Sequence, residues 1–284
     1  MTEDLLGSYR EMVFPAARTA ATDTLRMGLT RHHVPVLLEV DVSAARERLA
    51  DARSSGDDLS FTAWAIECVA QAAGEHKRVH AVRRGRRGLV VFDDVDVSLP
   101  VFRRLTGADH GERVPMPYVV RCANEKTVAQ ISAELRRAQC LPLAPGEQWV
   151  APDGLVPPPR LLRLAYATPF LLRKWLYWDR LLGDPFRVKR TMGTVMVTSV
   201  SVATRSGSRA WAIPIGIHPL IVALGAVSRA PAALGEEAGE PAPVRGPREI
   251  LSLTVLFDHD VVDGVPMALF LRRLTELMEE AFGL

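Results

Sequence analysis

The sequence predicts an α+β fold in which a mixed sheet is covered by helices. Residues 34–42, VPVLLEVDV, alternate acidic and aliphatic side chains with the period of a β-strand. Residues 61–76, FTAWAIECVAQAAGEH, instead repeat apolar side chains at helical spacing. Segments of both kinds follow one another through the first 140 residues, which is the pattern of a two-layer α+β sandwich.

Further elements surround these two in the first half of the chain. Ser43 is the expected N-cap of a helix formed by AARERLADAR. Residues 79–102 are expected to form two strands joined by RRGRRG, the second strand being LVVFDDVDVSLPVF. A strand VPMPYVVRC then leads into a helix from Asn124 to Gln139, whose acidic start and basic finish suit the helix dipole.

Residues 141–159 interrupt this order. Proline and glycine are frequent in LPLAPGEQWVAPDGLVPPP, which predicts a long loop. A basic, hydrophobic insert follows at 160–190, with two short helices divided near Pro169. Such helices can lie on a membrane surface, cap a substrate pocket or pack in a subunit interface, and packing is the more frequent outcome. We expect one domain over residues 1–284 that contains this loop and insert.

The last third of the chain returns to strands and ends in a helix. Strand-like segments are expected at 193–202, 219–227 and 248–262, and a helix begins at Pro266. These segments supply the strands that complete the sheet and one more covering helix.

Composition excludes several classes of function. The net charge of +2 gives no field that would attract nucleic acid. The three cysteines, Cys68, Cys122 and Cys140, are widely spaced without CxxC pairs, so neither disulfides nor a zinc site is predicted. No signal peptide or membrane span is recognisable, and we expect a cytoplasmic protein. The four arginines of RRGRRG form either a phosphate-binding turn or a solvated one.

The densest chemical signal is the HxxxDG pattern of His259, Asp263 and Gly264. An apolar strand delivers His259, and a tight turn before a proline-started helix holds it rigidly, as a general base requires. The alternatives are a structural strand histidine and, for Asp263, a helix N-cap. Thr198 or Ser199, in the strand VMVTSVS, offers a hydroxyl that can stabilise an oxyanion, unless both are simply solvated strand residues.

The segment SLTVLFDHDVVDGVPMALFLRRLTELM resembles the C-terminal signature of the acyltransferase component of 2-oxoacid dehydrogenase complexes and, more distantly, chloramphenicol acetyltransferase. Upstream, VPVLLEVDVSAARERL resembles the family's first strand and helix, and LSFTAWAIECVAQAAGEHKRVHA resembles its next helix. GTVMVTSVSV resembles the strand that bears the oxyanion hydroxyl. The resemblance spans most of residues 15–284 and implies the sandwich of the chloramphenicol acetyltransferase type.

The resemblance also implies residue roles. His259 would take the proton of an attacking thiol, and Asp263 would pair with an arginine, for which Arg18 is the candidate. The oxyanion hydroxyl falls on Thr198, with Ser199 adjacent. Ser199 and Gly264 are expected to line the substrate site, and no metal is expected.

Partners follow from the same resemblance. It implies a homotrimer, with a higher assembly as an option, and an active site between subunits that coenzyme A and an acyl carrier enter from opposite ends. No tightly bound cofactor is expected. The sequence contains no lipoyl domain, so a lipoyl-like acyl carrier is expected on a separate protein. Asp260 replaces the family's basic residue after the histidine, which keeps a second reading open, a catalytically silent assembly or binding module.

Overall fold

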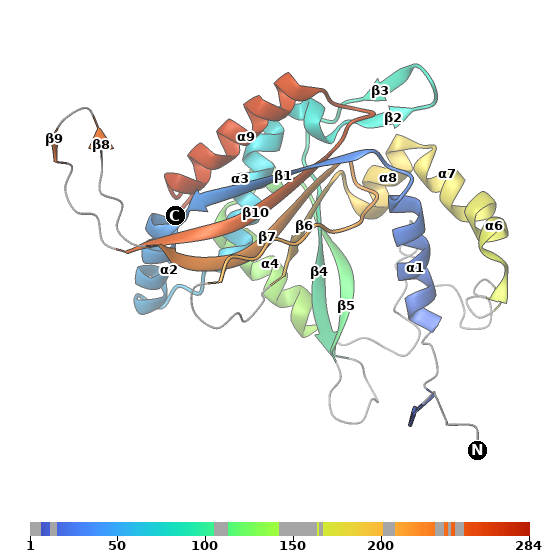
Figure 1. Ribbon diagram of the computed structural model, residues 1–284, viewed down its shortest axis with the longest axis horizontal. Coiled ribbons are helices and arrows are strands. Elements are labelled where there is room, and N and C mark those ends of the chain that lie inside the picture. Colours follow the sequence, from blue (N-terminus) through green and yellow to red (C-terminus); the bar gives the residue numbers. More distant parts are fainter. Residues whose placement is uncertain are drawn as a thin grey trace.

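Figure 1 shows the computed structural model of the chain. It describes residues 7–11, 16–104, 113–141, 164, 167–200, 208–230, 236–237, 240–241 and 247–284. All but the first residue of the loop predicted at 141–159 therefore lies outside the described residues.

Helices and strands alternate through the described chain. The strands are β1 His33–Asp41, β2 Val82–Arg84, β3 Gly88–Val90, β4 Val97–Arg104, β5 Arg113–Val120, β6 Val195–Ser199, β7 Leu220–Ala230, β8 Glu236–Glu237, β9 Glu240–Pro241 and β10 Arg248–Asp258. The helices are α1 Ala16–Gly28, α2 Ser43–Ser54, α3 Phe61–Glu75, α4 Val128–Cys140, α6 Phe170–Arg173, α7 Asp179–Leu182, α8 Pro185–Met192 and α9 Gly264–Glu279. Short 3₁₀ turns form η1 Lys77–His80 and η2 Ala123–Glu125, and a π-helical turn forms η3 Lys174–Trp178.

A six-stranded mixed sheet forms the centre of the fold, in the order β1-β10-β7-β6-β4-β5. The β1/β10, β10/β7 and β4/β5 pairs are antiparallel, whereas β6 runs parallel to both of its neighbours. Helices α2, α3, α4 and α9 cover one face of the sheet, and α1 with α6 to α8 lie at one end (Figure 1). The predicted α+β class, a mixed sheet covered by helices, is confirmed.

The main core lies between the sheet and the helices on its covered face. Alternate residues of β10 enter this core because successive strand side chains point to opposite faces. Phe257 is one of them and meets Phe270 of α9 edge to face at 5.7 Å, while Trp64 of α3 is fully buried. Because the covered face is filled by large apolar side chains, the positions of β10 and α9 are fixed by packing.

Two local predictions at helix starts are wrong. Ser43 is the first residue of α2 rather than its N-cap, which is Val42. The Ser43 hydroxyl instead donates to Asp41 Oδ1 at 2.6 Å and accepts the Glu249 N–H at 2.8 Å. The helix predicted from Asn124 begins at Val128, because Thr127 closes a capping box with Gln130.

The second strand predicted within 79–102 is divided in two. Its first part, β3, pairs with β2 in a separate hairpin, and its second part, β4, joins the central sheet. The chain turns between them because the buried carboxylate of Asp96 accepts from the Cys122 N–H at 2.9 Å and from Arg121 Nη1 at 3.0 Å. The RRGRRG turn therefore lies at the tip of a short, exposed hairpin.

The insert predicted at 160–190 is helical after Pro169, whereas most of its part before Pro169 lies outside the described residues, so the predicted division near Pro169 stays a prediction. Residues 170–182 follow Pro169 as consecutive helical turns, and α8 comes after a break at Asp184. Its inner side packs Trp178 and Leu181 against Met27 of α1 in a second hydrophobic cluster. None of the described helices is long and apolar enough to cross a membrane.

The C-terminal residues close over a buried carboxyl group. Trp64 Nε1 donates to the Phe282 carbonyl at 3.1 Å, and Glu67 Oε2 has no hydrogen-bond partner within the described structure. Gly283, at φ +79°, lies so close that a Cβ there would be 2.2 Å from Glu67 Oε2. Burial raises the pKa of Glu67 to about 7, against a smaller lowering by a backbone hydrogen bond from Val128.

We expect Glu67→Gln to stabilise the protein in alkali and to leave it unchanged in acid. The folded-state pKa is above the ordinary value of 4.5, so the folded protein holds a proton that the unfolded chain releases. Stability therefore falls as the pH rises from about 4.5 to about 7, and the glutamine removes this loss. Thermal unfolding at pH 4 and pH 8 measures the difference between the two proteins.

Glu75, on the same helix, is a control because its pKa is shifted in the opposite direction. Arg273 Nε donates to Glu75 Oε2 at 2.7 Å and lowers the pKa of that carboxyl. Glu75→Gln should therefore destabilise the protein at pH 8. Equal effects of the two substitutions at pH 8 would contradict the raised pKa of the buried Glu67 carboxyl.

Candidate active site

His259 lies directly after β10, where three segments hold the backbone. The His259 N–H donates to the His32 carbonyl at 3.0 Å, and the Asp258 N–H donates to the Pro219 carbonyl at 2.9 Å. The N–H groups of Val261 and Val262 then both donate to the Asp258 carbonyl, which forms the tight turn. The backbone of His259 is thus fixed while its ring is exposed.

Two carboxylates flank His259, and each has a basic partner. Asp258 is buried and pairs with Arg31 at 3.3 Å, while its Oδ1 accepts the Asp260 N–H at 3.1 Å. Asp260 contacts His32 Nδ1 at 3.0 Å, and Arg83 of the β2–β3 hairpin lies 3.9 Å away. Sequence reasoning missed Arg31 and His32, although both directly precede β1, the strand that pairs with β10.

The next three predicted site residues lie at helix starts or on a helix surface: Asp263, Gly264 and Arg18. Asp263 is the N-cap of α9, as predicted, but its side chain makes no capping hydrogen bond. Gly264 is the first residue of α9 and has open space around it. Arg18 is exposed on α1, and no ion pair joins it to Asp263 in the described chain, where Arg31 and Arg83 are the arginines that pair with residues of the turn after β10. The Arg18–Asp263 pair stays a prediction.

Thr198 and Ser199 point to opposite faces of the sheet. Ser199 pairs with Leu224, whose side chain lies in the core under the helices, so Ser199 faces the helix layer. Thr198 pairs with Ala223, which in turn pairs with Thr254, and this row faces away from the helices. The two hydroxyls therefore cannot serve the same site.

Ser199 belongs to a hollow of about 540 Å³ on the helix face. The hollow lies between β4, α4 and the segment before α3, and Val197 lines it beside Ser199. Its polar side includes Ser132, whose hydroxyl accepts the Ser60 N–H at 3.0 Å, and Arg136, which pairs with Asp58. Ser199 is thus placed as a lining residue of this hollow rather than beside Thr198.

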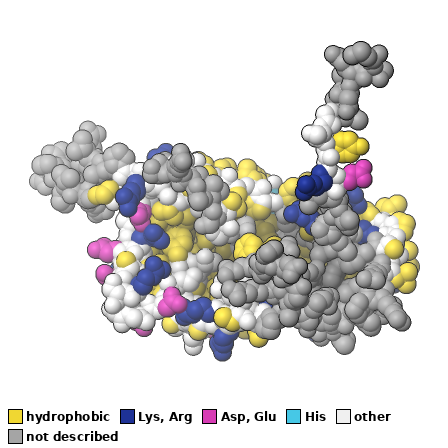
Figure 2. All heavy atoms as spheres, turned by 90° about the horizontal axis from the view of Figure 1, so that it is seen from below, with side chains coloured by type: hydrophobic (Ala, Val, Ile, Leu, Met, Phe, Trp, Pro, Cys, Tyr) yellow, Lys and Arg dark blue, Asp and Glu magenta, His cyan; other side chains and the backbone are white. Residues whose placement is uncertain are grey.

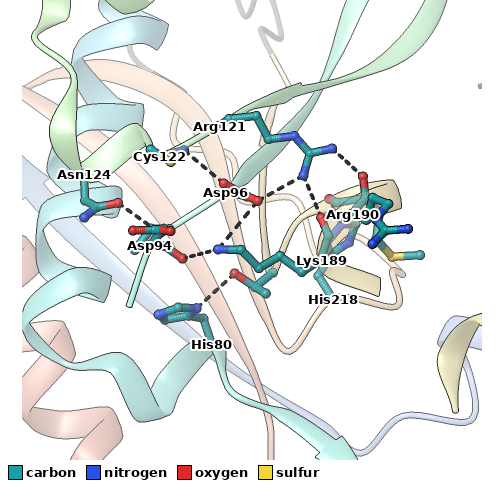
Figure 3. Close-up of polar contacts among 12 residues, drawn as sticks. His80, Asp94, Asp96, Arg121, Cys122, Asn124, Lys189, Arg190 and His218 are labelled. Atoms are coloured by element: carbon teal, nitrogen blue, oxygen red, sulfur yellow. Dashed lines mark hydrogen bonds and ion pairs between the residues drawn. The ribbon is translucent and has the colours of Figure 1, made fainter. Parts of the chain in front are cut away.

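A buried polar cluster fixes the start of the strand that carries Thr198 (Figure 3). The Asp96 carbonyl accepts the N–H groups of Thr194 and Val195 at 3.1 and 3.2 Å. The Thr194 hydroxyl is 2.9 Å from Nδ1 of the fully buried His80. A Cβ at Gly193, which has φ +72°, would be 2.5 Å from the Asp96 carbonyl oxygen, so only glycine fits there.

The buried histidines of this region are not candidates for the base. Burial lowers the pKa of His80 to about 4 and that of His218 to about 4. His80 Nε2 and His218 Nδ1 have no hydrogen-bond partner among the described atoms. Both rings are therefore neutral and enclosed, whereas the ring of His259 can meet a substrate.

The comparisons with known proteins agree with this geometry. Residues 192–284 match the family model of the 2-oxoacid dehydrogenases acyltransferase (catalytic domain). A probable dihydrolipoamide acetyltransferase from Listeria monocytogenes 4b F2365 aligns with a TM-score of 0.61 and 16% identity, over 96% of each chain. The dihydrolipoamide acetyltransferase of Azotobacter vinelandii aligns with a TM-score of 0.61 and 17% identity, over 99% of this chain and 95% of that one.

A truncated catalytic core of the 2-oxoacid dehydrogenase multienzyme complex from Thermoplasma acidophilum aligns with a TM-score of 0.60 and 15% identity, over 97% of this chain and all of that one. A comparison with curated protein sequences gives no match. The structural likenesses establish the fold, and the family match covers the segment with Thr198, His259 and Asp263. Both the match over residues 192–284 and the fold agree with the sequence resemblance to the acyltransferase component of 2-oxoacid dehydrogenase complexes.

Proposed function

We propose that the protein transfers an acyl group between coenzyme A and a thiol, hydroxyl or amine acceptor, with His259 as the general base. One observation supports this proposal most strongly. The segment that matches the acyltransferase catalytic domain contains His259, which is exposed at the end of β10 and has a backbone held by hydrogen bonds. An imidazole can accept a proton and return it, so it is suited to proton transfer at such a position.

The proposed reaction needs two protein groups. His259 takes the proton from the acceptor as the acceptor attacks the thioester carbonyl, and a hydroxyl donates a hydrogen bond to the oxygen that becomes negative. When the intermediate collapses, the carbon–sulfur bond breaks and the leaving thiolate recovers the proton from His259. Thr198 is the proposed donor, because it lies on the face of the sheet opposite the helix layer and is partly exposed.

The two groups lie far apart in one chain. Thr198 is in register with Thr254, two strands away, and Thr254 precedes His259 by five residues. At about 3.3 Å per residue, their levels along the sheet differ by about 17 Å. A site that uses both groups therefore needs two copies of the chain, which supports the homotrimer with its sites between subunits.

The same region offers apolar surface for such an interface. Large apolar side chains are exposed on β1 and on the segment that precedes β7: Val34, Leu37, Ile213 and Ile215. Contiguous exposed apolar surface commonly marks a protein interface. One relative in the comparison is the cubic core of the pyruvate dehydrogenase multienzyme complex, and we propose a trimer here, with higher assembly as an option.

Thiol release from a panel of acyl-coenzyme A compounds tests the proposal. Dihydrolipoamide, free or on a separate lipoyl protein, is offered as acceptor beside small alcohols and amines. Turnover that depends on His259 identifies an acyltransferase and begins to name its acyl group. A folded trimer without turnover on any donor would favour the second candidate, a catalytically silent assembly or binding module. Asp260, in place of the family's basic residue after the histidine, points to this candidate.

The helices of the insert also expose a surface for a partner. Large apolar side chains point outward from α6 and η3: Leu171, Leu172, Trp175 and Leu176. Hydrophobic side chains line the right-hand edge of Figure 2, at the end of the molecule where α6 lies in Figure 1. Trp175 lies beside Arg180, with the guanidinium carbon 5.3 Å from the ring centroid. Aromatic and aliphatic side chains beside cations are typical of helices that lie on anionic lipid.

We expect this surface to bind vesicles that contain anionic lipid, and flotation at low salt measures it. Trp175→Ser with Leu171→Ser should abolish co-flotation without changing acyl transfer, since both side chains are exposed and lie outside the matched catalytic segment. Val265→Ser, another exposed apolar position, is the matched control. Absence of flotation by the unaltered protein at low salt would exclude the membrane and leave a protein interface.

A further inference from the structure

The β2–β3 hairpin carries four exposed arginines: Arg83, Arg84, Arg86 and Arg87. Gly85, at φ +60°, forms the tight turn, so the arginines extend from both sides of a small tip. The carbonyl of Gly85 accepts from Arg83 Nε at 3.1 Å. The hairpin is a separate two-stranded sheet outside the central sheet.

This hairpin lies beside the candidate base. Arg83 Nη1 is 3.9 Å from Oδ2 of Asp260, the residue that follows His259. Figure 1 shows the hairpin next to the turn that joins β10 to α9. The tip residue Arg86 is three positions further along the chain, up to about 10 Å from Arg83. The arginines therefore reach from the neighbourhood of the base toward solvent.

The arginines at the tip of the β2–β3 hairpin are not neutralised by nearby carboxylates of the described residues. Arg86 and Arg87 form no ion pair within the described residues, and Asp260 is already shared by Arg83 and His32. Arg84 lies over the ring of Phe186, 5.9 Å from its centroid, and that ring is 52% exposed. Guanidinium groups beside an exposed aromatic ring match the phosphates and the base of a nucleotide.

We propose that the β2–β3 hairpin binds the phosphates of the nucleotide part of coenzyme A while the thioester lies at His259 of the same chain. This inference rests on the proposed acyl transfer, which makes coenzyme A the donor. Coenzyme A carries its thiol at the end of an extended pantetheine arm, so its phosphates must be bound well away from the base. Arg86 and Arg87 hold the phosphates, and Phe186 offers a stacking surface to the adenine.

Direct binding tests the site without any turnover. Calorimetry compares adenosine 3′,5′-bisphosphate and coenzyme A on the unaltered protein, on Arg86→Gln with Arg87→Gln, and on a matched control. The control, Arg53→Gln with Arg229→Gln, removes the same charge from exposed positions on α2 and β7, away from the hairpin. The hairpin variant should bind both ligands at least about tenfold more weakly, and the control should be unchanged.

A second experiment compares turnover of two acyl donors, one with and one without phosphates. Loss of the hairpin arginines should lower kcat/KM for acyl-coenzyme A and leave it unchanged for the same acyl group on phosphate-free pantetheine. Equal losses on both donors, or unchanged binding of the bisphosphate, would overturn the inference. Hairpin-dependent binding of the bisphosphate by a protein that transfers no acyl group would overturn the proposed function and leave the phosphate site standing.

Discussion

Replacing His259 with alanine is expected to lower kcat/KM for acyl transfer by about 10²- to 10⁴-fold, the usual contribution of a general base. Without the imidazole, the acceptor proton has no group in position to receive it. The loss should appear mainly in kcat, because the residue acts in the transition state rather than in holding the donor. Steady-state thiol release with a reactive acyl-coenzyme A measures both constants.

We expect this variant to keep its fold and the proposed trimer. The His259 ring is exposed, and the hydrogen bond to the His32 carbonyl comes from the backbone, which alanine retains. Thermal unfolding and size-exclusion chromatography check this. His76→Ala, at the end of α3, is the matched histidine control. A rate within a factor of about two of the unaltered protein would remove His259 from the mechanism.

Thr198→Val is expected to cost about 10²- to 10³-fold in kcat, because one oxyanion donor is lost while the shape of the side chain is kept. Ser199→Ala should leave kcat nearly unchanged, since Ser199 faces the hollow under the helices. The reverse order of effects would assign the oxyanion role to Ser199 and move the active site to the opposite face of the sheet.

Mixed trimers of these two variants test whether the site is shared between chains. His259→Ala chains still carry Thr198, and Thr198→Val chains still carry His259. If each site takes its histidine from one chain and its threonine from the next, about a quarter of the sites in randomly mixed trimers are complete. Co-expression should then restore activity that neither variant has alone. Mixed trimers as inactive as the parent variants would contradict a site between subunits.

Local patterns were enough to predict the α+β class, whereas the chloramphenicol acetyltransferase type followed from the sequence resemblance. The alternation in β1 and the helical spacing in α3 come from residues that face one core, so the sequence carries their structure directly. Errors arose where a distant group intervened. The Ser43 hydroxyl bonds to Asp41 and to the Glu249 N–H instead of capping α2. The strand predicted after Gly88 is divided near Asp96, whose carboxylate accepts from Arg121.

The candidate site was predicted in part for the same reason. His259 and Asp263 belong to one short motif, whereas Arg31 and His32 reach it from the start of β1 through strand pairing. The difference between Thr198 and Ser199 also needed the register of β6 against β7, which decides the face of each side chain. Spacing along the sequence carries no information about such pairings.

The contact between β6 and β4 consists of two residue pairs, Val97–Val195 and Ser98–Met196. The polar cluster around Asp96 ties the two strands together just before these pairs, and beyond them they diverge around the hollow that Ser199 lines. The β4–β5 ribbon is thus joined to β6 at one end only, and beyond that end it is held by α4, where Tyr118 donates to Glu134 Oε1 at 3.0 Å. Because so few residue pairs join β4 to β6, partial unfolding is expected to begin there, and amide hydrogen exchange should be faster in β5 than in β10. A ligand bound in the hollow would contact both β4 and β6 and should therefore slow amide hydrogen exchange in β5.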